Sequence, residues 1–188
     1  MGMYVPENVV GNEDLTKIMD TSDDWIVERT GIQERRHIKK GDGNTTAIMG
    51  VKASKIAIER AGIDKNDIDL ILFATLSPDY YFPGSGVIVQ QKLDIATCPA
   101  MDIRNQCSGF IYALSTADQF IKTGMYKNIL VIGSENHSGG LDMTTRGRSV
   151  SVIFGDGAGA VLVSACEDAD KGILSTHLHS EGQFAEEL

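Results

Sequence analysis

Cysteine is scarce in this sequence, and its few cysteines are poorly placed to pair. The 188 residues include three cysteines, Cys98, Cys107 and Cys166, which are widely spaced and form no CxxC motif. An odd, scattered set of this kind is not a disulfide framework and is typical of proteins in a reducing compartment. We therefore expect a cytoplasmic location.

Long apolar runs and an excess of basic residues are also missing. No segment approaches the roughly 20 apolar residues that cross a bilayer, and the first residues do not form a signal peptide. The 17 Lys and Arg residues are outnumbered by 26 Asp and Glu, which gives a net charge of −9. We therefore expect no membrane span and no nucleic acid partner.

Signals for a metal or a nucleotide are weak. His177 and His179 would share one face of a strand, but no third ligand stands at a convincing spacing, so no metal site is expected. The glycine-rich run 155–159 leads into strand-like residues, whereas a phosphate-binding loop leads into the N-terminus of a helix. These glycines favour close backbone packing instead, and we expect no permanently bound cofactor.

The sequence does contain an alternation of helices and buried strands. Hydrophobic residues make up 42% of the chain and charged residues 23%, which is ordinary for one globular domain. Helices are predicted at 12–19, around 25–27, and at 45–61, 85–93 and 110–121; strands are predicted before Pro6 and at 69–76, 99–103, 128–133, 149–154, 160–165 and 172–179. Asn12 is expected to cap the first helix, and 35–43 to form a loop. This order favours a mostly parallel α/β sheet with helices on both faces.

Cys107 falls at a special place in this pattern. Apolar residues recur every three or four positions from Phe110 to Ile121, which predicts an amphipathic helix that ends before Gly124. Cys107 then lies at or just before the helix N-terminus, where free N–H groups and the helix dipole favour a thiolate. Gly109 would let another group approach the sulfur. This geometry suits a nucleophile, although a buried packing cysteine is the competing interpretation.

Other residues could serve such a site, and several alternatives stay open. Five basic residues lie within twelve positions: Arg29, Arg35, Arg36, Lys39 and Lys40. They form either a patch for an anionic ligand or a solvated loop. Four histidines could pair with the cysteine: His37, His137, His177 and His179. Trp25, the only tryptophan, could stack on a ligand or pack as a partly buried anchor.

Several motifs occur together in a fixed order. They are DTSDDWIV at 20–27, RTGI at 29–32, FP at 82–83, CSGF at 107–110, RG at 146–147, FGDGAGA at 154–160 and STHLH at 175–179. Together they resemble the β-ketoacyl-acyl carrier protein synthase III family, thiolase-fold enzymes that start fatty acid synthesis. The resemblance covers essentially the whole chain and is specific, because no single motif carries it.

The resemblance implies a thiolase-like layered αβα fold with a mostly parallel five-stranded sheet and helices on both faces. Members of the family consist of two similar halves. Residues 1–188 resemble the N-terminal half, with the second half beginning at about residue 172 and its remainder absent. The histidine and asparagine that the family uses for malonyl decarboxylation belong to that second half, and none of the four histidines here matches. We therefore expect the chain alone to lack the condensation step.

The resemblance also implies site residues. The family takes an acyl group, typically acetyl, from acyl-CoA and condenses it with malonyl-acyl carrier protein to give a 3-oxoacyl-acyl carrier protein. By position, Cys107 would be the nucleophile, and Trp25 and Arg146 would hold the adenine of coenzyme A. Thr21, Arg29 and Gly147 would line the same site, and Phe82 would reach the acyl pocket of a homodimer partner. The coenzyme A thioester would be a substrate and not a resident cofactor.

Two other functions remain compatible with these residues. A thiolase-fold relative could pass the acyl group to an alcohol, an amine or another acceptor. A non-catalytic chain could bind acyl-CoA or act only as an interaction half. Hydroxymethylglutaryl-CoA synthase is disfavoured by the DWIV and RTGI motifs, and the sequence does not determine the length of the acyl primer.

Overall fold

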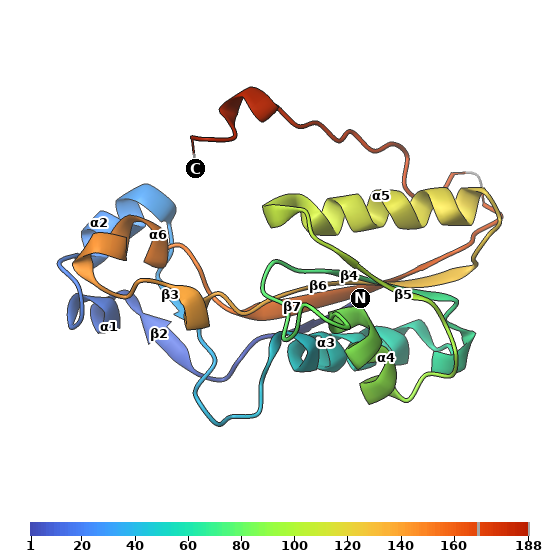
Figure 1. The fold of residues 1–188 in the computed structure, drawn as a ribbon, viewed down its shortest axis with the longest axis horizontal. Helices are drawn as coiled ribbons and strands as arrows, with labels where there is room; N and C mark the ends of the chain where they lie inside the picture. Colours follow the sequence, from blue (N-terminus) through green and yellow to red (C-terminus); the bar gives the residue numbers. More distant parts are fainter. Residues whose placement is uncertain (169, 188) are drawn as a thin grey trace.

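The computed structural model describes residues 1–168 and 170–187, and a five-stranded sheet lies at its centre (Figure 1). In spatial order the strands are β1 (Gly2–Tyr4), β7 (Gly157–Ser164), β6 (Asn128–Glu135), β4 (Leu70–Ala74) and β5 (Ala100–Ile103). β4 pairs in parallel with β5 and β6, whereas β7 is antiparallel to β6 and β1 is antiparallel to β7. All strands except β7 therefore point the same way, which confirms the mostly parallel sheet.

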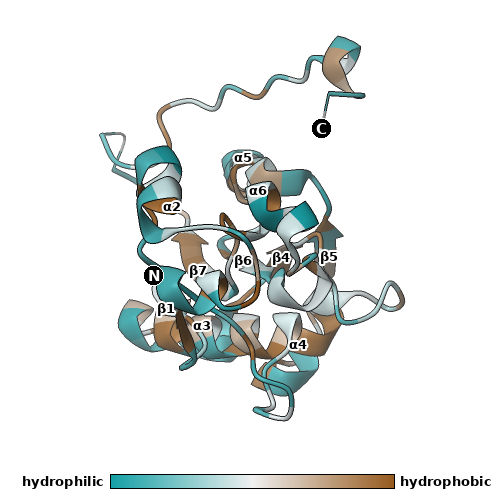
Figure 2. Cartoon of the chain, turned by 90° about the vertical axis from the view of Figure 1, so that its left-hand side faces the viewer, coloured by the Kyte–Doolittle hydropathy of each residue, from teal (hydrophilic) through white to brown (hydrophobic). Residues whose placement is uncertain are grey.

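Helices cover both faces of this sheet. They are α3 (Thr46–Ala61) and α4 (Ser85–Leu93) on one face and α5 (Gly109–Lys122) on the other (Figure 1). The side chains of β4 alternate between two cores: Ile71 and Phe73 belong to the core beside α3, and Leu70, Leu72 and Ala74 to the core beside α5. Because both faces of β4 are buried, its sequence is an unbroken apolar run. Figure 2 shows these hydrophobic strands enclosed between the helices.

The main helices begin and end where the sequence predicts. The Thr45 hydroxyl accepts a hydrogen bond from the backbone N–H of Ile48 at the start of α3. Gly62 ends that helix in the left-handed conformation, with φ +68°, which glycine adopts without strain. α4 has the predicted bounds, and α5 begins two residues after Cys107.

A smaller group of elements flanks one end of the sheet, on the left of Figure 1. It consists of β2 (Val9–Gly11), β3 (Glu34–Arg36), α1 (Asn12–Thr16), α2 (Asp23–Thr30) and α6 (Arg148–Ser151). β2 and β3 form an antiparallel pair, and Leu15, Met19, Ile26 and Val152 form a separate hydrophobic core. The 3₁₀ turns of the chain are η1 (Lys65–Asp67), η2 (Gln106–Ser108), η3 (Ser138–Gly140), η4 (Thr145–Gly147) and η5 (Gly182–Phe184).

Three predictions in this smaller group were wrong. The expected strand at 149–154 is replaced by the single helical turn α6, because Val152 turns into the small core and the segment has no strand beside it. The expected loop at 35–43 begins with the last residues of β3, which pair with β2. Asn12 is also not the cap of α1. Its buried amide donates to Asp23 and to the carbonyl of Ile32, and so ties α1 to α2 and the chain that follows it.

The expected strand at 172–179 is wrong as well. This segment runs on the outer side of α5, away from the sheet, so no strand is there to accept its hydrogen bonds (Figure 1). It touches α5 through side chains, as in the hydroxyl pair Ser115–Thr176 at 3.0 Å. Within residues 1–168 and 170–187, no helix is long and apolar enough to span a membrane.

Candidate active site

Cys107 lies in η2, the turn between β5 and α5. Its side chain is exposed and forms no disulfide. Gln106, the residue before it, has φ +34°, a left-handed conformation that is uncommon for a residue other than glycine. Backbone strain of this kind is concentrated at functional sites. The predicted position of Cys107 at the junction of strand, turn and helix is confirmed.

A cavity of about 250 Å³ lies beside Cys107. Its walls are mainly apolar, with a few polar groups. The side chains that line it come from Ala74, Leu76, Gln106, Cys107, Phe110, Ser134, Glu135, His137 and Phe154. They belong to the ends of β4 and β6, the start of α5 and the loop before β7. The carboxyl ends of neighbouring parallel strands are the usual place for a site in an α/β sheet.

Glu135 fixes one wall of this cavity. Its carboxylate accepts hydrogen bonds from the backbone N–H groups of Leu76 at 2.7 Å and Ser77 at 3.1 Å. The hydroxyls of Thr75 and Ser77 donate to the same carboxylate. Because Glu135 ends β6 and Leu76 follows β4, these bonds clamp the two strand ends together. The hydrogen bonds of the Glu135 carboxylate therefore serve to hold the fold together.

Two glycines, Gly109 and Gly133, also line the cavity. A Cβ at Gly133 would lie 3.2 Å from the ring of Phe110, so the missing side chain makes room for that ring. Gly109 was expected to open the approach to the sulfur. It lines the cavity together with Cys107, and a Cβ there would be in ordinary van der Waals contact with the Cβ of Ala74, 3.4 Å away.

The other two cysteines lie in different surroundings. Cys98 is half-buried beside the core under α3 and α4, and this burial raises the pKa of its thiol, with a further contribution from the charge of Asp69. Cys166 is exposed and follows the end of β7. Neither residue lines the Cys107 cavity.

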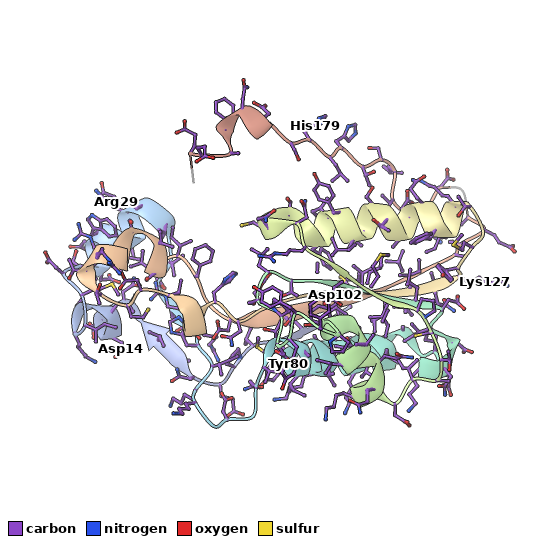
Figure 3. The ribbon with its side chains drawn as sticks, viewed as in Figure 1. Asp14, Arg29, Tyr80, Asp102, Lys127 and His179 are labelled. Atoms are coloured by element: carbon purple, nitrogen blue, oxygen red, sulfur yellow. The ribbon has the colours of Figure 1, made fainter. Side chains whose placement is uncertain are left out.

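Two guanidinium groups lie close to the rings of Trp25. The central carbon of Arg29 lies 4.6 Å from the centre of the Trp25 rings, and that of Arg148 lies 4.7 Å from it. Both distances are within the range of a cation–π interaction. Arg29 is one turn further along α2, where Figure 3 labels it, whereas Arg148 comes from α6. The sequence singled out Arg29 but missed Arg148, since no local pattern joins Arg148 to Trp25.

In this structure Arg146 pairs with Asp142 and not with Trp25. Its Nε donates to the carboxylate of Asp142 at 2.7 Å, and its side chain is 89% exposed. Hydrogen bonds from the Thr144 hydroxyl and then from Arg146 lower the pKa of Asp142. Gly147 lets this loop close, because a Cβ there would be 2.1 Å from the carbonyl oxygen of Asp142. The loop is joined to the Thr21 region, since the Thr145 hydroxyl accepts from the N–H of Asp20.

The five basic residues do not form one patch. Arg35 is buried, and its guanidinium donates to the side chain of Asn12 and to the carbonyl of Val152. Burial lowers the pKa of Arg35. Arg36 is half-buried and donates to the carbonyl of Pro6, while the two lysines are exposed. Arg35 is thus a structural cation that joins β3 to the segment after α6.

The structure separates the four histidines. His137 lines the Cys107 cavity, with its ring centre 4.8 Å from that of Phe154. His37 is buried, with its Nε2 3.4 Å from the carbonyl oxygen of Phe154. His177 and His179 are exposed on the C-terminal segment, where Figure 3 labels His179. In the part of the chain that the structure describes, no three His, Cys, Asp or Glu side chains are grouped to hold a metal ion.

Phe82 projects from the loop between β4 and α4 and is 91% exposed, next to the exposed rings of Tyr80 and Tyr81. The loop is anchored at its far end by Asp102 of β5, which lies by the start of α4 in Figure 3. The Asp102 carboxylate accepts from the N–H groups of Ser85 at 2.6 Å and Gly86 at 2.7 Å. A carboxylate at this position compensates the free N–H groups of the helix.

The chain is similar to several known proteins. A family model described as 3-Oxoacyl-[acyl-carrier-protein (ACP)] synthase III matches residues 101–182. The Beta-ketoacyl-[acyl-carrier-protein] synthase III 1 of Vibrio vulnificus is 54% identical over 187 residues, which cover 100% of this chain and 57% of that protein. The Beta-ketoacyl-[acyl-carrier-protein] synthase III of Sulfurimonas denitrificans is 49% identical over 189 residues, which cover 100% of this chain and 56% of that protein.

Solved structures of related proteins are similar to this chain over about half of their own length. The 3-oxoacyl-[acyl-carrier-protein] synthase III of Aquifex aeolicus superposes with a TM-score of 0.85 at 49% identity, over 89% of this chain and 53% of that one. The synthase III of Thermus thermophilus superposes with a TM-score of 0.91 at 35% identity, over 99% and 56%. The chain thus spans a little more than half the length of the relatives that it matches. By its sequence and its fold, it belongs to the 3-oxoacyl-[acyl-carrier-protein] synthase III family.

Proposed function

We propose that Cys107 accepts an acyl group from an acyl-CoA, with acetyl as the typical group. The whole protein then condenses this group with malonyl-acyl carrier protein to start fatty acid synthesis. The observation that carries the proposal is the exposed Cys107 at the start of α5, open to a cavity, in a chain with relatives that are named as synthases of this type. A cytoplasmic location fits three free thiols.

The loading step is a thioester exchange. The Cys107 thiolate attacks the acyl carbon, a new carbon–sulfur bond forms, and the bond to the sulfur of coenzyme A breaks. The coenzyme A thiolate leaves and takes up the proton that Cys107 gave to solvent, so no oxidant, metal or resident cofactor is needed. The attacking sulfur lies beside the start of α5, where backbone N–H groups lack partners within the helix.

The coenzyme A moiety belongs, in this proposal, beside Trp25. An indole stacks well on adenine, and Arg29 supplies positive charge at 4.6 Å from the Trp25 rings. Arg146 is exposed on the neighbouring loop, where exchange of its Asp142 contact for a ligand costs little. Thr21 and Gly147 complete this site. The Thr21 hydroxyl is buried and has no hydrogen-bond partner among the residues that the structure describes.

We further propose that residues 1–188 correspond to the N-terminal half of the family fold, with the second half beginning at about residue 172. Stabilisation of the carbanion from malonyl decarboxylation needs oriented donors, each of which contributes a factor of roughly 10² to 10³ in rate. The resemblance assigns those donors, a histidine and an asparagine, to the second half. We therefore expect acyl loading of the 188-residue chain without condensation.

Incubation of the chain with labelled acetyl-CoA and malonyl-acyl carrier protein tests this proposal. The expected result is acetyl label on Cys107, located by peptide mapping, with no acetoacetyl product. The Cys107→Ser variant is the control and should retain no thioester label. Steady turnover to acetoacetyl-acyl carrier protein would show that the catalytic donors lie in this chain, and label on Cys98 or Cys166 would refute the role of Cys107.

A further inference from the structure

His137 is the ionisable side chain of the Cys107 cavity that the scaffold leaves free. Glu135, the neighbouring carboxylate, accepts four hydrogen bonds from the segment after β4. The imidazole of His137 has no hydrogen bond to any residue that the structure describes, and its ring packs against Phe154 with 4.8 Å between ring centres. Besides the thiol and the amide of Gln106, the imidazole is therefore a polar group of the cavity that is free to bind a ligand or water.

The backbone on both sides of His137 is fixed. The N–H of Asn136 donates to the hydroxyl of Ser77 at 2.8 Å, and the N–H of Ser138 donates to the carboxylate of Asp156 at 2.8 Å. Asp156 is itself buried and also accepts from the N–H of Ile38. A side chain between two anchored residues, with an aromatic ring against one face, has little freedom to leave the cavity.

We propose that His137 determines which acyl groups Cys107 accepts, and that it restricts them to short chains. This inference rests on the proposed acyl transfer. A long apolar chain would cover the imidazole and leave its ring nitrogens without partners, which is unfavourable for a buried polar group. An acetyl group fills less of the roughly 250 Å³ cavity and leaves space for water to satisfy the imidazole. The preference for a short acyl group thus follows from the polarity of one wall.

The test compares Cys107 loading from acetyl-CoA and hexanoyl-CoA by intact mass spectrometry. We expect the wild type to favour acetyl, and His137→Leu to raise the ratio of hexanoyl to acetyl loading about tenfold. His137→Gln keeps a polar group and should keep the wild-type ratio. His177→Leu removes an exposed histidine outside the cavity and is the matched control. If His137→Leu does not fold, His137→Met supplies an unbranched apolar side chain.

A second pair of probes separates this inference from the proposed function. Iodoacetamide and N-hexyl-iodoacetamide alkylate Cys107 without any coenzyme A. If His137→Leu reacts relatively faster with the hexyl reagent than the wild type does, the role of His137 is supported, even when no acyl group is loaded from coenzyme A. In that case the missing acyl loading counts against the proposed function and not against this inference. An unchanged ratio in His137→Leu for every probe that reacts, or an equal rise in His137→Gln, would overturn the inference.

Discussion

Cys107 and Cys98 belong to the same stretch of chain but differ in their exposure. We expect iodoacetamide to modify Cys107 well before Cys98 at about pH 8, because burial raises the pKa of the Cys98 thiol and hides its sulfur. Cys166 is exposed but lacks the helix N-terminus that favours a thiolate. Peptide mapping of the partly labelled protein measures the three rates. Labelling in denaturant is the control, in which the three rates should converge, and faster labelling of Cys98 in the folded protein would contradict the expectation.

Arg146 offers a second test at the level of single residues. We expect Arg146→Ala to weaken coenzyme A binding about three- to tenfold, because it removes an exposed guanidinium beside the proposed adenine site. The loss should be larger at low salt, where charged contacts are screened less. Isothermal titration calorimetry at two salt concentrations measures both effects. Arg60→Ala, which removes an equal charge from the end of α3, should leave the affinity unchanged. Equal affinities for Arg146→Ala and wild type would count against this site.

The sequence predicts the positions and roles of some residues better than those of others. Cys107 could be placed because the helix after it has a clear apolar period, and that period depends only on local sequence. The choice of His137 among four histidines could not be made, because it depends on β6 lying beside β4. Arg35 could not be assigned either. A cluster of basic residues predicts a surface, whereas the partners of Arg35 are an amide and a carbonyl far away in the sequence.

Among the elements, β1 and α3 make a close contact that a single substitution can probe. A Cβ at Gly2 would lie 2.1 Å from the carbonyl oxygen of Ala53 and 2.7 Å from the backbone nitrogen of Ala57. We expect Gly2→Ala to lower the free energy of unfolding by about 1–3 kcal/mol, since the strand must shift away from the helix. Urea unfolding followed by circular dichroism measures this loss.

Gly159→Ala is the matched control for that substitution. Gly159 lies in β7 opposite Met3 of β1, and a Cβ there would have nothing within 4 Å. Its substitution should therefore leave stability unchanged or raise it slightly, because alanine loses less backbone entropy on folding. Similar losses for both variants would mean that the contact between Gly2 and Ala53 does not limit the approach of β1 to α3.

The elements also show where local sequence stops being sufficient. The helices α3, α4 and α5 could be predicted from local sequence, because apolar residues recur at helical spacing and Thr45 and Gly62 mark the ends of α3. The strand predictions at 149–154 and 172–179 failed for a different reason. Alternating β-branched residues favour an extended chain, but a strand also needs a hydrogen-bonding neighbour, and neither segment lies beside one. Such neighbours are a property of the tertiary fold.

At the level of the whole molecule, we expect the loop with Tyr80, Tyr81 and Phe82 to take part in self-association. These rings are 64%, 72% and 91% exposed, and aromatic groups gathered in this way are typical of a contact surface. We expect a homodimer that buries this loop and the neighbouring edge strand β5. Sedimentation velocity at micromolar concentration should show a dimer for the wild type and mainly monomer for Phe82→Asp. Phe184→Asp, on the C-terminal segment, is the control and should remain dimeric. A monomeric wild type would rule out this interface.

The Glu135 clamp has a consequence for how the cavity opens. Leu76 and Ser77 lie beyond the last residue of β4, yet both amide hydrogens are bound to Glu135. Exchange of these hydrogens with deuterium requires that the clamp break, so we expect protection close to that of β4 and faster exchange in Glu135→Ala. Solvent-like exchange at both positions in the wild type would contradict this. The wall of the Cys107 cavity that Glu135 fixes should then open only as rarely as the sheet itself. We therefore expect an acyl chain too long for the existing cavity to displace the other wall, around Gln106 and Cys107.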